Sequence, residues 1–122
     1  DHRLSLQVGN ARLWLEDRSG LCGVRSAGTA ASATLQMLGI PWPCHFHVDP
    51  AGTVRTVRSK GQVYVLVESS KPAAEPASND CETFLQAVRV QGNAVEISPH
   101  HDRVASCPPF QWDTVLFREL FE

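Results

Sequence analysis

The sequence predicts a mainly β fold: an antiparallel β-sandwich or curled sheet with at most one or two short helices and two disulfides. Short segments alternate apolar and polar residues, and turn-forming Gly, Asn, Pro and Asp separate them at regular intervals. Four cysteines lie far apart with no C-x-x-C pair. Because 122 residues can bury one core without subdivision, we expect residues 1–122 to form a single globular domain.

The first third of the chain begins with a predicted hairpin. Residues 3–8 and 12–16 both alternate, and Gly9 and Asn10 between them favour a tight turn. Residues 17–20 form a second turn that leads into a short strand around residues 21–25.

Two segments have open assignments. In residues 28–39, Thr29 could cap a short helix that ends at Gly39, but residues 34–37 alternate as a strand would. Residues 112–121 are too short and aromatic for periodicity to classify as helix or strand.

The middle of the chain contains three predicted extended segments. In residues 44–49, Phe46 falls on the core side, while His45 and His47 fall on the side that we expect to face solvent. A strand follows at residues 53–58, and residues 62–67 are apolar on both faces, which predicts a central strand.

The last third combines a loop and a hairpin. Residues 69–80 contain two prolines and little to bury, so we expect an exposed loop. Residues 83–90 and 94–98, joined by Gly92 and Asn93, predict a late hairpin, although Phe84, Leu85 and Val88 also suit a helical turn.

The cysteines indicate an oxidising compartment, because cytosolic thiols are kept reduced. Pairing Cys22 with Cys44 and Cys81 with Cys107 closes modest loops, but four cysteines permit three connectivities and the sequence does not choose. Four buried free thiols in a cytosolic protein are the alternative. Asp1 in place of Met fits a chain from which an export signal has been removed.

Charge and hydropathy exclude two classes of function. The formal net charge is −2 and the eleven Lys and Arg are scattered among acidic residues, so we expect no nucleic-acid partner. No run approaches the roughly 18 apolar residues of a membrane-spanning helix.

Catalytic and metal sites are weakly supported. There is no G-x-S-x-G motif, the cysteines look paired, and carboxylates such as Glu68, Glu75 and Glu96 are explained by solvation, so we assign no catalytic residue and expect no enzyme. His45 and His47 could share a metal ion with His100, His101 and Asp102. A periplasmic metal-binding protein is therefore the alternative function, although exposed histidines need no metal and we assign no metal ligand.

Two polar segments remain as candidates for binding a protein partner. Each is expected to leave the sheet as a loop on a cross-linked scaffold, and pre-ordered loops lose little entropy on association. Simple solvated connections are the alternative interpretation. The candidate contact residues are Glu68, Ser69, Ser70, Lys71, His100, His101, Asp102 and Arg103.

The four-cysteine framework, residues 60–70 (KGQVYVLVESS) and residues 98–102 (SPHHD) together resemble a known family. It is the family of periplasmic immunity proteins with which Gram-negative bacteria such as Pseudomonas resist their own type VI secreted muramidase effectors. The resemblance implies a precursor with a signal or lipoprotein peptide, a periplasmic location, and loops that plug the effector's peptidoglycan-binding groove. It implies no cofactor for this chain, although calcium held by the partner could lie at the interface.

Overall fold

The computed structural model describes residues 2–28, 33–75 and 79–122, and is mainly β as predicted. Its elements in chain order are η1 (His2–Leu4), β1 (Ser5–Val8), β2 (Ala11–Arg18), β3 (Leu21–Ala27), β4 (Thr34–Pro41), β5 (His45–Phe46), β6 (Val57–Ser59), β7 (Gln62–Pro72), β8 (Cys81–Gln91), β9 (Ala94–Val104) and α1 (Leu116–Glu119). None of the helices in these ranges is long and apolar enough to span a membrane.

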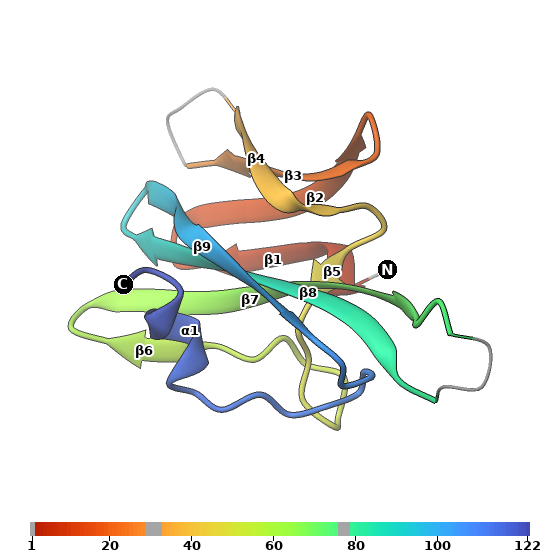
Figure 1. Ribbon diagram of the computed structural model, residues 1–122. Helices are drawn as coiled ribbons and strands as arrows, with labels where there is room; N and C mark the ends of the chain where they lie inside the picture. The colour runs from red at the N-terminus through yellow and green to blue at the C-terminus, as the bar shows by residue number, and fades with distance from the viewer. Residues whose placement is uncertain (1, 29–32, 76–78) are drawn as a thin grey trace.

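The first four strands form an antiparallel sheet in the order β1-β2-β3-β4, here called sheet A (Figure 1). The opening hairpin is confirmed, with Val8 opposite Ala11 and a positive φ of 56° at Gly9 in the turn. The strand expected near residues 21–25 is β3. The open assignment at residues 28–39 is settled as a strand from Thr34 onward, whereas the helix cap considered at Thr29 lies outside the described residues.

The remaining strands form an antiparallel sheet in the order β5-β7-β8-β9, here called sheet B, with β6 also paired to β7. Residues 63–69 of β7 are all buried, which confirms the predicted central strand. The late hairpin is confirmed as β8 and β9, with Gln91 opposite Ala94.

A hydrophobic cluster packs against each of the two faces of sheet B. One lies between the sheets and includes Leu13, Val24, Phe46, Val65 and Val88; we call it the inter-sheet cluster. The other packs the opposite face of sheet B against the C-terminal segment and α1, and we call it the C-terminal cluster (Figure 1). Its buried members are Tyr64, Leu66, Leu85, Ala87, Trp112, Phe117 and Leu120.

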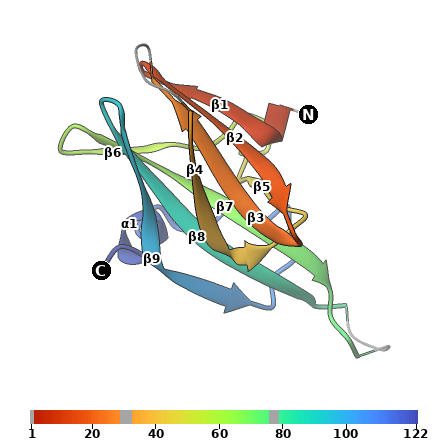
Figure 2. The ribbon, with the colours of Figure 1, turned by 90° about the horizontal axis from the view of Figure 1, so that it is seen from above.

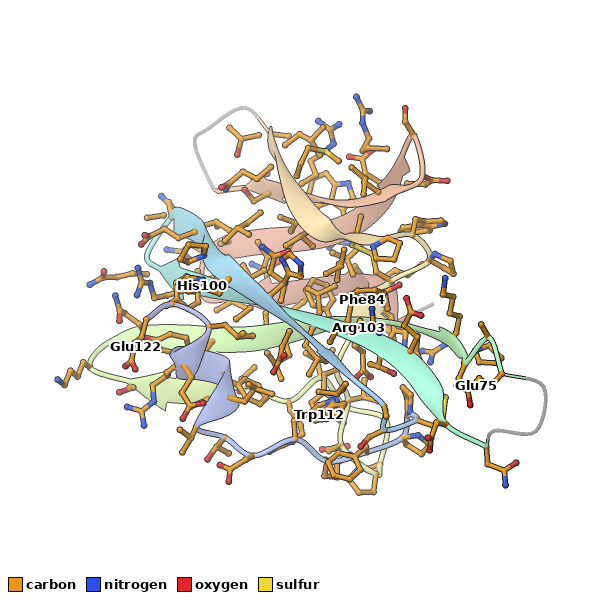
Figure 3. All side chains as sticks on the ribbon, in the orientation of Figure 1. Glu75, Phe84, His100, Arg103, Trp112 and Glu122 are labelled. Atoms are coloured by element: carbon orange, nitrogen blue, oxygen red, sulfur yellow. A yellow bond between two sulfur atoms is a disulfide. The ribbon has the colours of Figure 1, made fainter. Side chains whose placement is uncertain are left out.

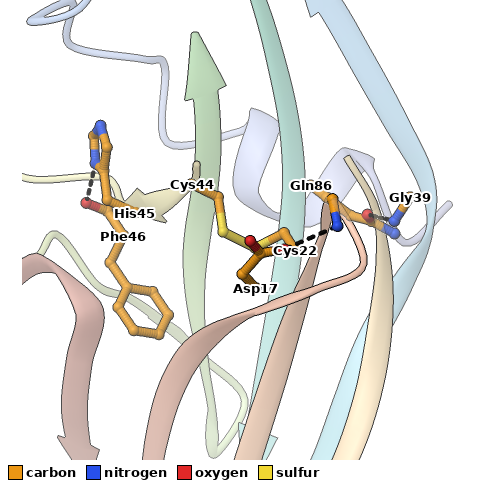
Figure 4. Close-up of a disulfide and its surroundings, with 8 residues drawn as sticks. Asp17, Cys22, Gly39, Cys44, His45, Phe46 and Gln86 are labelled. Atoms are coloured by element: carbon orange, nitrogen blue, oxygen red, sulfur yellow. Dashed lines mark hydrogen bonds between the residues drawn. A yellow bond between two sulfur atoms is a disulfide. The ribbon is translucent and has the colours of Figure 1, made fainter. Parts of the chain in front are cut away.

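The disulfides are Cys22–Cys44 and Cys81–Cys107, so of the three connectivities the structure has the one that closes two short loops. Cys22–Cys44 joins β3 to the segment before β5 inside the inter-sheet cluster (Figure 4). Close to it, the Gly39 backbone N–H donates a hydrogen bond of 2.7 Å to Gln86 Oε1, which links β4 of sheet A to β8 of sheet B.

Several predicted segments differ from the structure. Residues 69–72 belong to β7 and residues 99–103 to β9, where loops were expected, because pairing with β8 continues to Pro72 in β7 and to Val104 in β9. In the expected strand at residues 53–58 only Val57 and Arg58 lie in β6, and Val54 makes an isolated bridge with Val48. The open segment at residues 112–121 contains the four-residue α1.

Candidate interaction site

The far end of the β7–β8 hairpin projects beyond sheet A (Figures 1 and 2). We call this part the arm and define it as residues 69–75 and 79–84. The register continues to its end, where Lys71 faces Glu82 and Pro72 faces Cys81. The Ala73 N–H then donates to the Asp80 carbonyl at 3.0 Å, so the two sides of the arm stay paired into the connection.

The outer part of the arm is fixed to the chain that follows β9. The Cys81–Cys107 disulfide joins them, with 5.1 Å between the two Cα atoms. The Cys81 N–H donates to the Ala105 carbonyl at 2.9 Å, and Thr83 Oγ1 donates to the Ser106 carbonyl at 2.8 Å. These bonds hold the arm in one shape, so a partner that binds it need not order it first.

The eight predicted contact residues lie on two strands, β7 and β9, on either side of β8. Leu85 of β8 pairs with both Glu68 and Asp102, and Phe84 pairs with both Ser69 and Arg103. The structure therefore brings the two segments into one region of sheet B, with side chains alternating between its two faces.

The prediction that all eight residues contact a partner is wrong for two of them, because Glu68 is 2% exposed and Ser69 is 5% exposed. The C-terminal segment covers the face that carries Glu68, and β7 is a central strand at this point rather than a loop. A rigid partner could reach neither side chain. Ser70 is half-buried and shares a hydrogen bond of 2.8 Å with Thr83 Oγ1. The exposed members of the predicted set are Lys71, His100, His101, Asp102 and Arg103.

On the face that points toward sheet A, the arm carries a mixed apolar and charged surface. Phe84 and Arg103 are register partners and lie side by side (Figure 3). Phe84 is half-buried against the inter-sheet cluster, whereas Arg103 is exposed. Lys71 and Glu82 form an ion pair of 3.8 Å on the same face. Aromatic side chains and arginine are enriched at the centres of protein interfaces.

A hollow of about 470 Å³ lies between the outer part of the arm and the end of β9. Charged side chains of both signs open onto it, so it suits polar groups of a partner rather than an apolar ligand. Its described lining residues are Ala73, Ala74, Glu75, Asp80, Cys81, Glu82, Arg103, Val104 and Ala105.

Glu68 belongs to a buried network instead of the contact surface. Trp112 Nε1 donates a hydrogen bond of 2.9 Å to Glu68 Oε2, and His47 Nδ1 lies 3.6 Å from the same oxygen. Arg55 Nη1 lies 2.9 Å from His47 Nε2 and donates to the Trp112 carbonyl at 2.7 Å. Since a guanidinium only donates, Nε2 accepts and the proton of a neutral His47 is on Nδ1, directed at Glu68.

The same network fixes the charge of Glu68. Burial by itself would raise the pKa of Glu68, but hydrogen bonds from His47 and Trp112, with smaller electrostatic contributions from His47 and His45, outweigh it and lower the pKa. Glu68 is therefore an ionised carboxylate at neutral pH that ties the C-terminal segment to β7.

The expectation that His47 faces solvent is wrong, since His47 is 1% exposed. The Trp112 and Phe117 rings cover this side of the strand, with centroids 6.5 Å and 6.2 Å from the imidazole. His45 points away from Phe46, as the alternation predicts, and is partly exposed (Figure 4).

The two histidine pairs that could have shared a metal ion lie at opposite edges of sheet B. His45 and His47 lie at the β5 edge of sheet B, and His100 and His101 lie on β9 at the other edge. Throughout the described ranges, no three His, Cys, Asp or Glu side chains are placed to hold one metal ion.

Phe84 and Trp112 were missed by the sequence analysis. The alternation of β8 gives a signal for Phe84, because it falls on the opposite face from Thr83 and Leu85. Trp112 has no local signal, since its partner Glu68 lies 44 residues away. Comparison of the chain with protein-family models, curated proteins and solved structures gives no match.

Proposed function

We propose that this protein is a periplasmic immunity protein, which binds a secreted cell-wall-degrading muramidase and inhibits it by inserting the arm into the substrate groove. The observation that carries the proposal is the shape of the arm: a paired β-hairpin end that extends past sheet A and is cross-linked near its outer end by Cys81–Cys107. A rigid projection of this kind can insert into a groove of complementary shape.

The chemistry of the arm supports a protein target. Its surface carries Phe84, Arg103 and the Lys71–Glu82 pair, and glycan-cleaving enzymes line their grooves with carboxylates and hydrogen-bonding groups. Arg103 offers such a groove a cation in a fixed position. The two disulfides are consistent with an oxidising compartment, where such an enzyme would meet peptidoglycan.

The test begins with recovery of the partner. The oxidised protein, immobilised through a surface tag, is incubated with envelope extract of the producing organism, and retained cell-wall hydrolases are identified and purified. Lysis of purified peptidoglycan is then followed by turbidity as the protein is added. We expect lysis to stop at one equivalent and a stable complex to elute on size exclusion. Retention of no hydrolase, or undiminished lysis at tenfold excess, would reject the proposal.

A further inference from the structure

The outer face of sheet A is covered by no element of the described chain. α1 and the C-terminal segment pack on the far side of sheet B, and Figure 2 shows sheet A in front with nothing over it. A sheet face of this kind is available to a partner.

The strand register defines which side chains share this face. Leu13, Leu15 and Val24 point inward to the inter-sheet cluster, so their neighbours along the strands point outward. Four cross-strand rows result: Gln7, Arg12 and Ala27; Ser5, Trp14, Arg25 and Leu35; Glu16, Gly23 and Met37; Arg18, Leu21 and Pro41. We call these residues the outer face.

The outer face is basic in a protein whose net charge is −2. It carries three arginines, and among its described residues Glu16 is the single carboxylate. Glu16 forms ion pairs with Arg25 and, at 3.8 Å, with Arg18, which lie in the two adjacent rows, while Arg12 lies two rows away. The arginines were scattered in the sequence, and strand pairing gathers them.

Large apolar side chains lie between these charges. Met37 and Leu21 are each 45% exposed, and Trp14 and Leu35 are half-buried. Beside Trp14 the small side chains of Ser5 and Ala27 leave a hollow of about 520 Å³, whose other described lining residues are Leu4, Arg12 and Leu15. Tryptophan, methionine and arginine together, with few carboxylates, are typical of protein interfaces.

We propose that the outer face binds an acidic segment of a partner protein, with an apolar side chain of that segment in the hollow beside Trp14. The positive charge of the outer face favours an acidic partner over a second copy of this chain. A second copy would bring three arginines against three arginines, which repel one another. A lipid surface fits less well, because Trp14 sits half-buried in the face of a twisted sheet rather than projecting from it.

The size of the face sets the strength of the interaction. Three strands of seven or eight residues and one of four, β1, span roughly 400 Å², at the low end for a specific interface. We therefore expect a reversible complex with a dissociation constant in the micromolar range, weakened by salt. This surface is separate from the arm and does not depend on the inhibitor proposal.

The test places a photo-crosslinking benzoylphenylalanine in the full chain at Met37, and a matched control at Val115, which is 43% exposed and lies just before α1. After irradiation in the producing cells, the crosslinked segment is identified by mass spectrometry. We expect position 37, and not position 115, to crosslink one protein repeatedly at a segment with excess Asp and Glu.

The purified partner is then titrated against the wild-type protein, the Arg12→Glu variant and the Arg58→Glu variant. We expect Arg12→Glu to weaken binding at least tenfold, and Arg58→Glu, an exposed arginine on β6 of sheet B, to leave it unchanged. Three crosslinking results would overturn the proposal: equal crosslinking from both positions, no crosslink, or a crosslinked segment that is neutral or basic. Unchanged binding of Arg12→Glu would also overturn it, as would adducts with lipid together with cosedimentation with phosphatidylglycerol vesicles. Circular dichroism of each variant checks that the fold is retained.

Discussion

Glu68 is the residue whose role the structure changes most. The sequence places it among surface carboxylates, whereas the folded chain buries it beneath Trp112 and His47. Its hydrogen bonds must be satisfied because an unpaired buried charge is strongly destabilising. The Glu68–Trp112 bond therefore holds the C-terminal segment in place.

Glu68→Gln is expected to lower the free energy of unfolding at pH 7 by about 1–3 kcal/mol, because the amide oxygen can accept from Trp112 or His47 but no longer carries a charge. The pKa of Glu68 is lower in the folded state than the ordinary value of 4.5. Its stabilising contribution is therefore complete above pH 4.5 and is lost as the pH falls through the folded-state pKa.

Urea unfolding from pH 7 to pH 3 measures this effect. The stability of the wild-type protein should fall more steeply below pH 4.5 than that of Glu68→Gln, and the two curves should converge in acid. Glu75→Gln, at an exposed carboxylate, is the control and should follow the wild type. Parallel curves for wild type and Glu68→Gln would contradict the prediction.

Arg103 is the residue on which the inhibitor proposal can be tested most directly. Arg103→Ala should raise the dissociation constant for the muramidase by tenfold or more, which corresponds to about 1.4 kcal/mol. Arg58→Ala, also at an exposed arginine, should change it less than twofold. Calorimetric titration of the purified hydrolase measures both, and equal affinities of the two variants would show that Arg103 makes no important contact.

At the scale of elements, the arm exists because β7 and β8 pair over their full lengths and not only where sheet A covers them. The prolines and small residues after Lys71 suggest a loop, yet pairing with β8 carries the strand to Pro72. The Cys81–Cys107 bond then supports the part of the hairpin that has no second sheet against it.

Removal of either disulfide should therefore lower the stability of the protein by a similar amount, whereas only removal of Cys81–Cys107 should weaken binding of the hydrolase. The two disulfides enclose loops of similar length, with separations of 22 and 26 residues, so removing either pair with serine should cost about 3 kcal/mol. We expect Cys81→Ser/Cys107→Ser to weaken binding of the hydrolase at least tenfold under conditions where it is folded. Cys22→Ser/Cys44→Ser, buried between the sheets, should leave binding within twofold. An equal loss of affinity from both pairs would mean that the arm needs no cross-link.

At the scale of the whole molecule, sheet B is the layer that joins the two clusters. One face of β7 and β8 packs against sheet A, and the other packs against Trp112 and α1. Loss of either cluster exposes a buried face of the same two strands, so the molecule should unfold in one cooperative transition.

Phe117→Ala tests this coupling, because Phe117 is fully buried in the C-terminal cluster and its truncation should cost about 3–5 kcal/mol. Native-state hydrogen exchange should show the same loss of protection for Leu13 and Val24 in sheet A as for Leu66 in sheet B. Met37→Ala, at an exposed side chain, should change neither the free energy of unfolding nor the exchange protection of the two sheets. A loss confined to sheet B would show that the sheets unfold separately.

The sequence by itself determined the β class, the opening and late hairpins, the buried central strand and the oxidised cysteine framework. Each depends on patterns that act locally: alternation sets which residues share a face, and residues such as Gly9 and Gly92, both with positive φ, permit the turns. These signals lie within a few residues of the structure that they specify.

Tertiary structure alone decided what covers each face. Glu68 and His47 are buried by Trp112 and Phe117, which follow them by at least 44 residues, and the basic outer face forms only when Arg12, Arg18 and Arg25 are brought into register. Alternation reports which residues point the same way, but burial depends on the distant segment that packs there, and no local pattern encodes that segment.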